Sequence, residues 1–283
     1  MAFDVKTFYT RATTALVFVA LLLGCVWYSY LSFILFFAVI GFIGLYEFYR
    51  LVQKMNVKPI KIVGYLLHVL AIIITLWYPF LRTPIYFKAL PHIFIALCFS
   101  LFIIELFSGS SSLHNIGYIL LSLLYVTIPC CILISMSSSF DFILATFSFH
   151  PQKVLGMIFF VWINDTGAYL VGSFFGKHKL YEKISPNKTW EGTLGGIALC
   201  ITLSFVVANI LPQLALKHWI AISVIVAVFG TLGDLKESML KRMAGVKDSG
   251  SIMPGHGGVL DRFDSLFFAT PFVFCYLALM GLL

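Results

Sequence analysis

Residues 116–137 read IGYILLSLLYVTIPCCILISMS, a run without a charged side chain. At about 1.5 Å per residue, a helix of this length can cross a hydrocarbon layer roughly 30 Å thick. Similar apolar runs recur along the chain, near residues 13–30, 31–49, 63–80, 90–107, 154–175, 192–212, 218–234 and 265–283. The sequence therefore predicts an all-α fold, a polytopic transmembrane helical bundle of about nine spans. The count falls to eight if the break at Tyr28-Ser29-Tyr30 does not separate the first two runs.

The composition excludes an ordinary soluble domain. Of the 283 residues, 60% are hydrophobic and 11% are charged, whereas soluble domains are about 45–50% apolar and about 25% charged. The six cysteines all fall inside apolar runs, where small buried residues are expected rather than disulfides or metal ligands. No linker or repeat divides the chain, so we expect one integral membrane domain over residues 1–283.

The basic residues are distributed unevenly over the predicted loops. With nine spans, fifteen of the 19 lysines and arginines fall on one side of the membrane, in the N-terminal segment and in the second, sixth and eighth loops. Because cytoplasmic flanks collect Lys and Arg, this distribution predicts a cytoplasmic N-terminus and a C-terminus on the opposite side. The charges are dispersed over short loops, which argues against nucleic acid as a partner and favours anionic lipid headgroups and phosphorylated substrates.

Polar residues inside the spans distinguish the two halves of the chain. Residues 1–150 carry few of them and are expected to form mainly scaffold spans, whereas residues 154–283 are expected to form a catalytic half with a polar cavity facing the cytoplasm. The one carboxylate that stands out in the first half is Glu47. An ion pair with Arg50, three residues further on, is its simpler explanation, and a role in the site is the alternative.

One face of the span that ends near residue 242 carries three different polar groups. Helical spacing places Asp234, Ser238 and Lys241 at positions i, i+4 and i+7, and it turns Glu237 about 300° away from Asp234. A carboxylate at the membrane boundary is costly unless it meets a cation, a hard divalent ion needs oxygen ligands, and phosphate needs Lys or Arg. This polar stripe therefore suits a metal-bound phosphate.

The segment from Lys247 to Asp264 is rich in glycine, which allows backbone amides to approach an anion closely. Asp261 and Asp264 lie about one turn apart where the last span begins, and Asp261 could meet Asp234 across a metal ion. The alternative is a solvated loop with helix-capping aspartates. It explains Asp264 but not the full combination of residues from Lys247 to Asp264.

The run from Ser238 to Asp264, S-x-x-K-R-x4-K-D-x-G-x2-M-P-G-H-G-G-V-x-D-R-F-D, resembles the signature of the phosphatidate cytidylyltransferase family, the CDP-diacylglycerol synthases. Two upstream stretches are similar to that family as well, Ser185-Pro186-Asn187-Lys188-Thr189-Trp190-Glu191-Gly192 and Asn164-Asp165-Thr166-Gly167-Ala168-Tyr169. Met253 is the one departure, since it stands where Leu, Ile or Phe is expected. The resemblance covers about residues 160–265 by motif and the remainder only by hydropathy.

This resemblance implies transfer of a cytidylyl group from CTP to phosphatidic acid, with release of pyrophosphate, at the bacterial cytoplasmic membrane. It also implies Mg²⁺, a monovalent cation such as K⁺, and a homodimer. Because the nucleophile is already a phosphate, the protein has to neutralise two polyanions and align them, without an activated Ser or Cys.

The same resemblance assigns roles to individual residues. We expect Asp234 and Asp261 to bind the metal, with Ser238 and Lys241 beside them in the catalytic group. The expected substrate-binding residues are Ser185, Lys188, Thr189, Arg242, Lys247, Asp248, His256, Gly257, Gly258, Arg262 and Asp264. Asn164 and Asp165 are expected to support the polar cavity.

Two other functions remain open. A related CTP-dependent lipid or polyprenol phosphotransfer enzyme is the nearer alternative. A secondary ion transporter could use the intramembrane Asp165 and Asp234, although no inverted repeat is visible and the polar residues crowd one face of the membrane. The stretch Gly172–His178 has neither the spacing nor the Ser or Thr of a P-loop.

Overall fold

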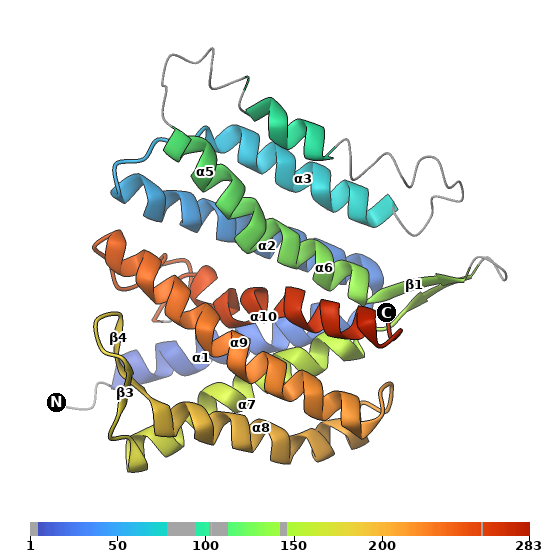
Figure 1. Ribbon diagram of the computed structural model, residues 1–283, viewed down its shortest axis with the longest axis vertical. Coiled ribbons are helices and arrows are strands. Elements are labelled where there is room, and N and C mark those ends of the chain that lie inside the picture. Colours follow the sequence, from blue (N-terminus) through green and yellow to red (C-terminus); the bar gives the residue numbers. More distant parts are fainter. Residues whose placement is uncertain (1–4, 78–93, 102, 104–112, 142–145, 256) are drawn as a thin grey trace. The chain divides into compact units, whose positions relative to one another are not determined.

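The computed structural model of the protein describes residues 5–77, 94–101, 103, 113–141, 146–255 and 257–283 (Figure 1). Most of these residues are helical. The chain divides into two compact units, Met1–Phe149 with Asp248–Leu260 and His150–Lys247 with Asp261–Leu283. The first unit thus includes a loop that comes from the C-terminal part of the sequence. The predicted run near residues 90–107 lies partly outside the described residues.

The first unit is built from helices that follow the predicted apolar runs. They are α1 (Val5–Tyr28), α2 (Tyr30–Lys54), α3 (Lys61–Trp77), α5 (Leu113–Ser122), one π-helical turn η2 (Leu123–Thr127) and α6 (Ile128–Met136). Since α5, η2 and α6 follow one another without a break, together they form the helix predicted from residues 116–137. An antiparallel hairpin of β1 (Ser138–Asp141) and β2 (Thr146–Phe149) follows α6.

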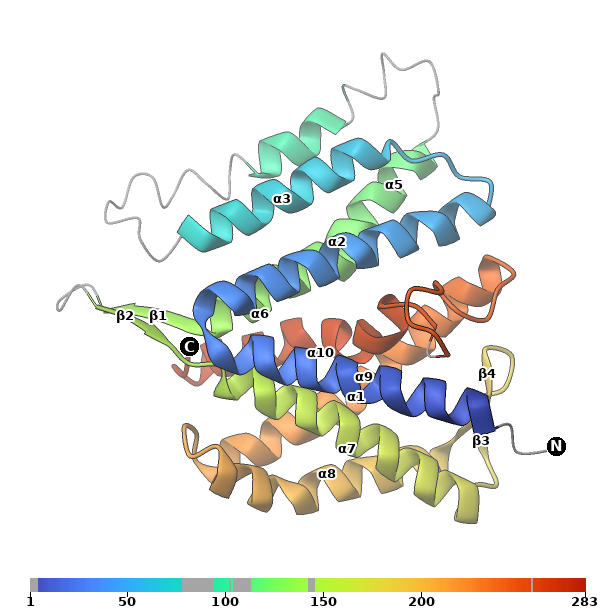
Figure 2. The same ribbon diagram turned by 180° about the vertical axis from the view of Figure 1, so that it is seen from behind.

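Ser29 separates α1 from α2. Its backbone is extended, its hydroxyl accepts a hydrogen bond from Ser32 N, and the Ser32 hydroxyl accepts one from Ser29 N, which together make a capping box. The two helices pack against each other and form a helical hairpin around this residue (Figure 2). The predicted break at Tyr28-Ser29-Tyr30 is therefore confirmed, while the total of nine spans stays a prediction.

Polar pairs join the helices of the first unit inside an otherwise aromatic and aliphatic core. Tyr49 in α2 shares a 2.7 Å hydrogen bond with Ser122 in α5, and His68 Nδ1 in α3 lies 3.0 Å from Thr127 Oγ1 in η2. All four residues are buried. Hydrogen bonds of this kind link helices where lipid tails give little hydrophobic driving force for their association.

The second unit contains four helices and a second hairpin. They are α7 (Gln152–Phe175), β3 (Lys179–Tyr181), β4 (Ser185–Thr189), α8 (Trp190–Ile210), α9 (Leu216–Met243) and α10 (Leu260–Leu279), of which Asp261 onward belongs to this unit. β3 and β4 pair antiparallel between α7 and α8. α9 packs on both α7 and α8, and a ring pair of Phe229 and Phe272, stacked at 3.6 Å between centroids, joins it to α10.

Glycines allow α7 and α8 to pack very closely. These two helices run side by side in both views (Figure 2). A Cβ atom on Gly196 would lie 2.8 Å from the backbone oxygen of Asn164, and one on Gly167 would lie 3.0 Å from the Cα of Gly196. Small residues at such crossings are typical of membrane helix pairs. The close packing brings Asn164, a predicted cavity residue, against α8.

Six helices within the described residues are long and apolar enough to cross a membrane. They are Tyr30–Lys54, His114–Met136, Gln152–Phe175, Trp190–Ile210, Leu216–Met243 and Leu260–Leu279, and Ala12–Tyr28 and Lys61–Leu76 are shorter apolar helices. The chain is thus an all-α bundle of a multi-pass membrane protein, as the sequence predicts. The all-α prediction did not include the two small β-hairpins.

Candidate active site

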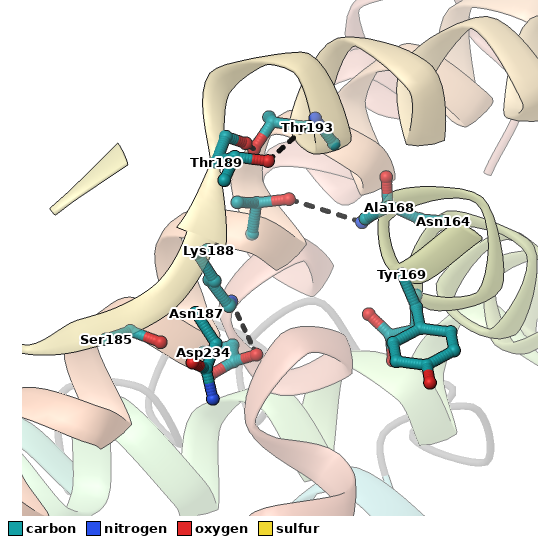
Figure 3. Close-up of a pocket in the computed structure, with 12 residues that line it drawn as sticks. Asn164, Ala168, Tyr169, Ser185, Asn187, Lys188, Thr189, Thr193 and Asp234 are labelled. Atoms are coloured by element: carbon teal, nitrogen blue, oxygen red, sulfur yellow. Dashed lines mark hydrogen bonds and ion pairs between the residues drawn. The ribbon is translucent and has the colours of Figure 1, made fainter. Parts of the chain in front are cut away.

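A cavity of about 330 Å³ opens between α7, β4, α8 and α9 of the second unit (Figure 3). Most of its lining residues carry a polar side chain, and they include members of the two upstream motifs together with Asp234 of the polar stripe. The lining residues are Asn164, Asp165, Ala168, Tyr169, Ser185, Asn187, Lys188, Thr189, Gly192, Thr193, Thr231 and Asp234. The structure therefore brings together six predicted residues, namely Asn164, Asp165, Ser185, Lys188, Thr189 and Asp234.

The motif from Ser185 to Gly192 forms one wall of the cavity because it changes from strand to helix at Thr189. Thr189 is the N-cap of α8, and its hydroxyl oxygen accepts a 3.1 Å hydrogen bond from Gly192 N. Glu191 in the first turn accepts hydrogen bonds from the backbone N–H groups of Lys177 and His178. This carboxylate therefore fixes the segment between α7 and β3, a role that the motif alone did not reveal.

Lys188 and Asp234 face each other inside the cavity. Lys188 Nζ lies 2.5 Å from Asp234 Oδ2, and the side chains are 26% and 32% exposed. Asp234 Oδ1 accepts a 3.2 Å hydrogen bond from Ser238, one turn further along α9. The predicted i, i+4 relation of Asp234 and Ser238 is thus present. Since both charged side chains remain accessible, they can exchange this ion pair for contacts with a ligand.

Asn164 and Asp165 lie on the α7 wall. Asn164 is buried, its Nδ2 donates to Thr231 Oγ1 at 3.2 Å, and its Oδ1 has no hydrogen-bond partner among the described residues. Asp165 interacts electrostatically with Asp234, Lys188 and Arg262. The two residues therefore contribute an unused acceptor and a second carboxylate to the surroundings of the Lys188–Asp234 pair.

A second charged cluster lies at the end of α9. Lys241 Nζ lies 2.7 Å from Glu237 Oε2 and 2.7 Å from Asp261 Oδ1 at the start of α10. Glu237 is only 1% exposed and Asp264, which interacts with it electrostatically, is buried. The helical spacing that turns Glu237 away from Asp234 did not reveal this contact, in which Lys241 lies between Glu237 and Asp261.

The oxygen atoms around these two clusters fit a divalent cation shared with a ligand. Carboxylates outnumber basic groups among the side chains that interact electrostatically here. The carboxylates are Asp165, Asp234, Glu237, Asp261 and Asp264, and the basic groups are Lys188, Lys241 and Arg262. Glu237 Oε1 is also buried without a hydrogen-bond donor in the described part of the chain.

The described residues contain no ready-made group of three His, Cys, Asp or Glu side chains that could enclose a metal. Mg²⁺ commonly binds proteins through one or two carboxylates together with water and substrate phosphates, and a magnesium site stays a prediction here. Asp234 forms an ion pair with Lys188, and Asp261 forms one with Lys241. That Asp234 and Asp261 share one metal ion stays a prediction.

The remaining predicted residues lie outside the cavity lining. Arg242 is exposed, and it donates to the backbone oxygens of Ile184 and Val246 at 3.4 and 3.2 Å. Lys247 and Arg262 are exposed in the second unit, and Asp264 Oδ1 accepts from Ser265 N at 2.6 Å. Asp248, Gly257 and Gly258 belong to the first unit, and His256 lies outside the described residues.

Glu47 in the first unit is held differently from the ion pair expected for it. Arg50 is exposed and its guanidinium lies 5.8 Å from the ring centre of Tyr46. Glu47 is 0% exposed and accepts hydrogen bonds from Ser249 Oγ, Val259 N and Leu260 N at 3.0, 3.0 and 2.8 Å. The interfacial Glu47–Arg50 pair was therefore wrong, because the carboxylate is turned inward to the loop Asp248–Leu260.

These features define a class of protein, a multi-pass helical membrane protein with a charged cavity built from its C-terminal helices. Comparison with known proteins identifies its family. The model of the Cytidylyltransferase family matches residues 9–280, and the chain belongs to this family. The resemblance drawn from the sequence motifs is thereby confirmed.

Individual relatives carry a more specific name. The chain is 50% identical over 122 residues to a phosphatidate cytidylyltransferase of Staphylococcus epidermidis, which covers 42% of this chain and 46% of that protein. It is 50% identical over 123 residues to one of Bacillus subtilis (43% and 45%) and 43% identical over 162 residues to one of Staphylococcus haemolyticus (56% and 58%). The chain spans about half the length of the curated relatives it matches.

Proposed function

We propose that this protein is a phosphatidate cytidylyltransferase, which converts CTP and phosphatidic acid into CDP-diacylglycerol and pyrophosphate. A phosphate oxygen of the lipid attacks the α-phosphorus of CTP. The bond from that phosphorus to the oxygen bridging toward the β-phosphate breaks, and pyrophosphate leaves with the electron pair. The observation that carries the proposal is the accessible Lys188–Asp234 pair inside the cavity of a chain that belongs to this family.

The residues of the cavity can bind and orient the reacting phosphates. The Lys188 ammonium is a point charge for a phosphate oxygen, and Ser185 and Thr193 present hydroxyl groups on the same wall. Positioning and charge neutralisation are the main tasks in phosphoryl-type transfers, because the phosphorus chemistry itself needs no covalent help from the protein. When substrate displaces Asp234 from Lys188, the carboxylate becomes available as a metal ligand.

We propose Asp234 and Asp261 as the protein ligands of Mg²⁺, whose chemistry here would be to neutralise the developing charge on the pyrophosphate. Lys241 holds the Asp261 carboxylate in place through its 2.7 Å contact, and Ser238 does the same for Asp234 through its hydrogen bond. A monovalent cation such as K⁺ and a homodimer are further parts of the proposal, and they are carried over from the sequence resemblance.

We further propose nine spans, a cytoplasmic N-terminus, a C-terminus on the opposite side and a cavity that opens to the cytoplasm of a bacterial cell. The excess of lysine and arginine on one set of loops supports this orientation. The bacterial source of the relatives supports the cytoplasmic membrane as the location.

Labelled CTP tests this function directly. The purified protein in detergent is incubated with phosphatidic acid and Mg²⁺, and with CTP that carries phosphorus label at either the α or the γ position. A cytidylyltransferase puts the α label into lipid and leaves the γ label in pyrophosphate. Entry of γ label into a lipid or polyprenol would show the alternative phosphotransfer reaction. Absence of label from lipid in both experiments would refute the proposal.

A further inference from the structure

The buried Glu47 carboxylate joins two segments that lie far apart in the sequence. It sits in α2, whereas its donors come from both ends of the loop Asp248–Leu260, Ser249 at the beginning and Val259 and Leu260 at the end. All of these residues belong to the first unit. In Figure 1 the loop is the orange-to-red segment between α9 and α10. One carboxylate therefore fixes the beginning and the end of this loop together.

The donors from Val259 and Leu260 would have no partner in an isolated helix. They stand where α10 begins, and the first N–H groups of a helix lack acceptors within that helix. Glu47 supplies both acceptor atoms, Oε1 for Val259 and Oε2 for Leu260, and a carboxylate is the group best suited to a helix N-terminus. The contact thus gives hydrogen-bond partners both to the Glu47 carboxylate and to the backbone N–H groups of α10, at a place where water is excluded.

Two glycines make room for this carboxylate. A Cβ atom on Gly250 would overlap Glu47 Oε1, and a Cβ atom on Gly258 would overlap both Ser249 Oγ and Glu47 Oε2. The glycines of the loop therefore have a packing function in addition to the anion approach expected from the sequence. A side chain at either position would therefore force the Glu47 carboxylate or the loop to move.

We infer that Glu47 is a positioning residue, which holds the loop Asp248–Leu260 in the conformation that the cytidylyl transfer requires. The inference rests on the proposed function, because the loop carries Asp248, Gly257 and Gly258, which are predicted to bind substrate. The chain also enters the loop directly after Lys247 and leaves it directly before Asp261. Glu47 acts through this loop and is assigned no contact with substrate.

The first test compares Glu47→Gln and Glu47→Asp with the parent protein in detergent. Glu47→Gln replaces one acceptor oxygen by a donor that faces N–H or O–H groups, so we expect kcat/KM for CTP to fall by about 100-fold in protein that remains folded. Glu47→Asp keeps the carboxylate and should lose only about tenfold. Arg50→Gln, an exposed change of charge on the same helix, is the matched control and should behave as the parent.

Gly250→Ala tests the same contact without a change of charge. It should reproduce the loss of Glu47→Gln, whereas Gly117→Ala, whose Cβ would have no atom within 4 Å, should not. Size-exclusion chromatography and thermal unfolding report the folded fraction, so that activity is counted per folded molecule. Parental kcat/KM in folded Glu47→Gln or folded Gly250→Ala would overturn the inference.

Hydrogen exchange keeps the inference testable if both variants fail to fold or if the parent shows no transfer. In the parent protein the amides of Val259 and Leu260 should exchange slowly, because Glu47 is their acceptor, and Arg50→Gln should leave them slow. Exchange as fast as in an exposed loop would overturn the inference. Slow exchange in an inactive parent would refute the proposed reaction while supporting the contact.

Discussion

Lys188 Nζ and Asp234 Oδ2 lie 2.5 Å apart in a cavity that leaves their side chains 26% and 32% exposed. The lysine comes from the end of β4 and the aspartate from α9, so the pair connects two separate sequence motifs. An exposed ion pair adds little to the stability of a protein. Its position among polar lining residues is the observation on which its proposed role in binding a charged ligand rests.

Removal of the lysine should damage activity more than folding. In Lys188→Ala we expect kcat/KM for CTP to fall by about 100-fold, or roughly 2.7 kcal/mol, because a phosphate-binding charge is lost. Thermal unfolding should remain close to that of the parent. Lys183→Ala, an exposed lysine in the turn between β3 and β4, is the control and should keep parental activity.

The double variant Lys188→Ala, Asp234→Ala separates two explanations of the pair. If the lysine only neutralises the aspartate, removal of both should restore activity relative to the single changes. We expect no such recovery in initial rates, because each side chain has its own role toward the substrates. Recovery to near the parental rate would contradict this assignment.

The metal prediction concerns Asp234 and Asp261. Asp234→Asn and Asp261→Asn should each abolish turnover at saturating CTP, and the double substitution should cost little more than either alone, because both residues serve one ion. Initial rates over a Mg²⁺ titration provide the measurement. Near-parental activity in either variant at any Mg²⁺ concentration would show that the shared site is wrong.

The cluster around Lys241 should govern stability. Lys241→Met leaves Glu237 and Asp261 as carboxylates without their cation, which typically costs about 3–5 kcal/mol at a buried site. Glu237→Gln removes only one partner of the lysine, so it should be milder. Thermal unfolding in detergent should therefore rank the parent above Glu237→Gln and Glu237→Gln above Lys241→Met. The reverse order of the two variants would contradict this interpretation.

Close packing between α7 and α8 makes Gly196 sensitive to substitution. An added Cβ would meet the backbone oxygen of Asn164 at 2.8 Å, so Gly196→Ala should destabilise the protein by about 1–3 kcal/mol. Gly24→Ala, where a Cβ would have no atom within 4 Å, should leave stability unchanged or slightly improved. Comparison of their unfolding temperatures checks the prediction, and equal temperatures would contradict it.

Topology can be tested with reporter tags. Tags at the N-terminus and near Lys183 should report the cytoplasm, and a tag after Leu283 should report the opposite side, because most basic residues fall on one set of loops. Detection of both termini on the same side would refute the nine-span arrangement.

Local patterns predicted the helices well, since apolar runs and helical spacing depend on neighbours in sequence. The break at Ser29 and the bond between Asp234 and Ser238 are both relations of this kind. The pair of Glu237 and Lys241 had the same local signal, an i, i+4 spacing of opposite charges. It was missed because Lys241 was assigned to the stripe of Asp234, seven residues earlier.

Contacts between distant segments could not be predicted in this way. Nothing near Glu47 in the sequence indicates that its acceptors are used by Ser249, Val259 and Leu260, and the nearby Arg50 favoured a different explanation. Likewise the motifs around Lys188 and Asp234 each indicated a binding role, but only the fold brings these two side chains into contact.

The separation of Glu47 from its partners has a consequence for biosynthesis. Ser249 follows Glu47 by 202 residues, which a ribosome working at roughly 5–20 residues per second needs about 10–40 s to add. During that interval α2 has left the ribosome while its inward-facing acid still lacks the hydroxyl and amide groups that later surround it. The nascent first unit therefore cannot reach its final structure until Leu260 has been translated, and chains that stop before Ser249 should be preferred substrates for membrane proteases.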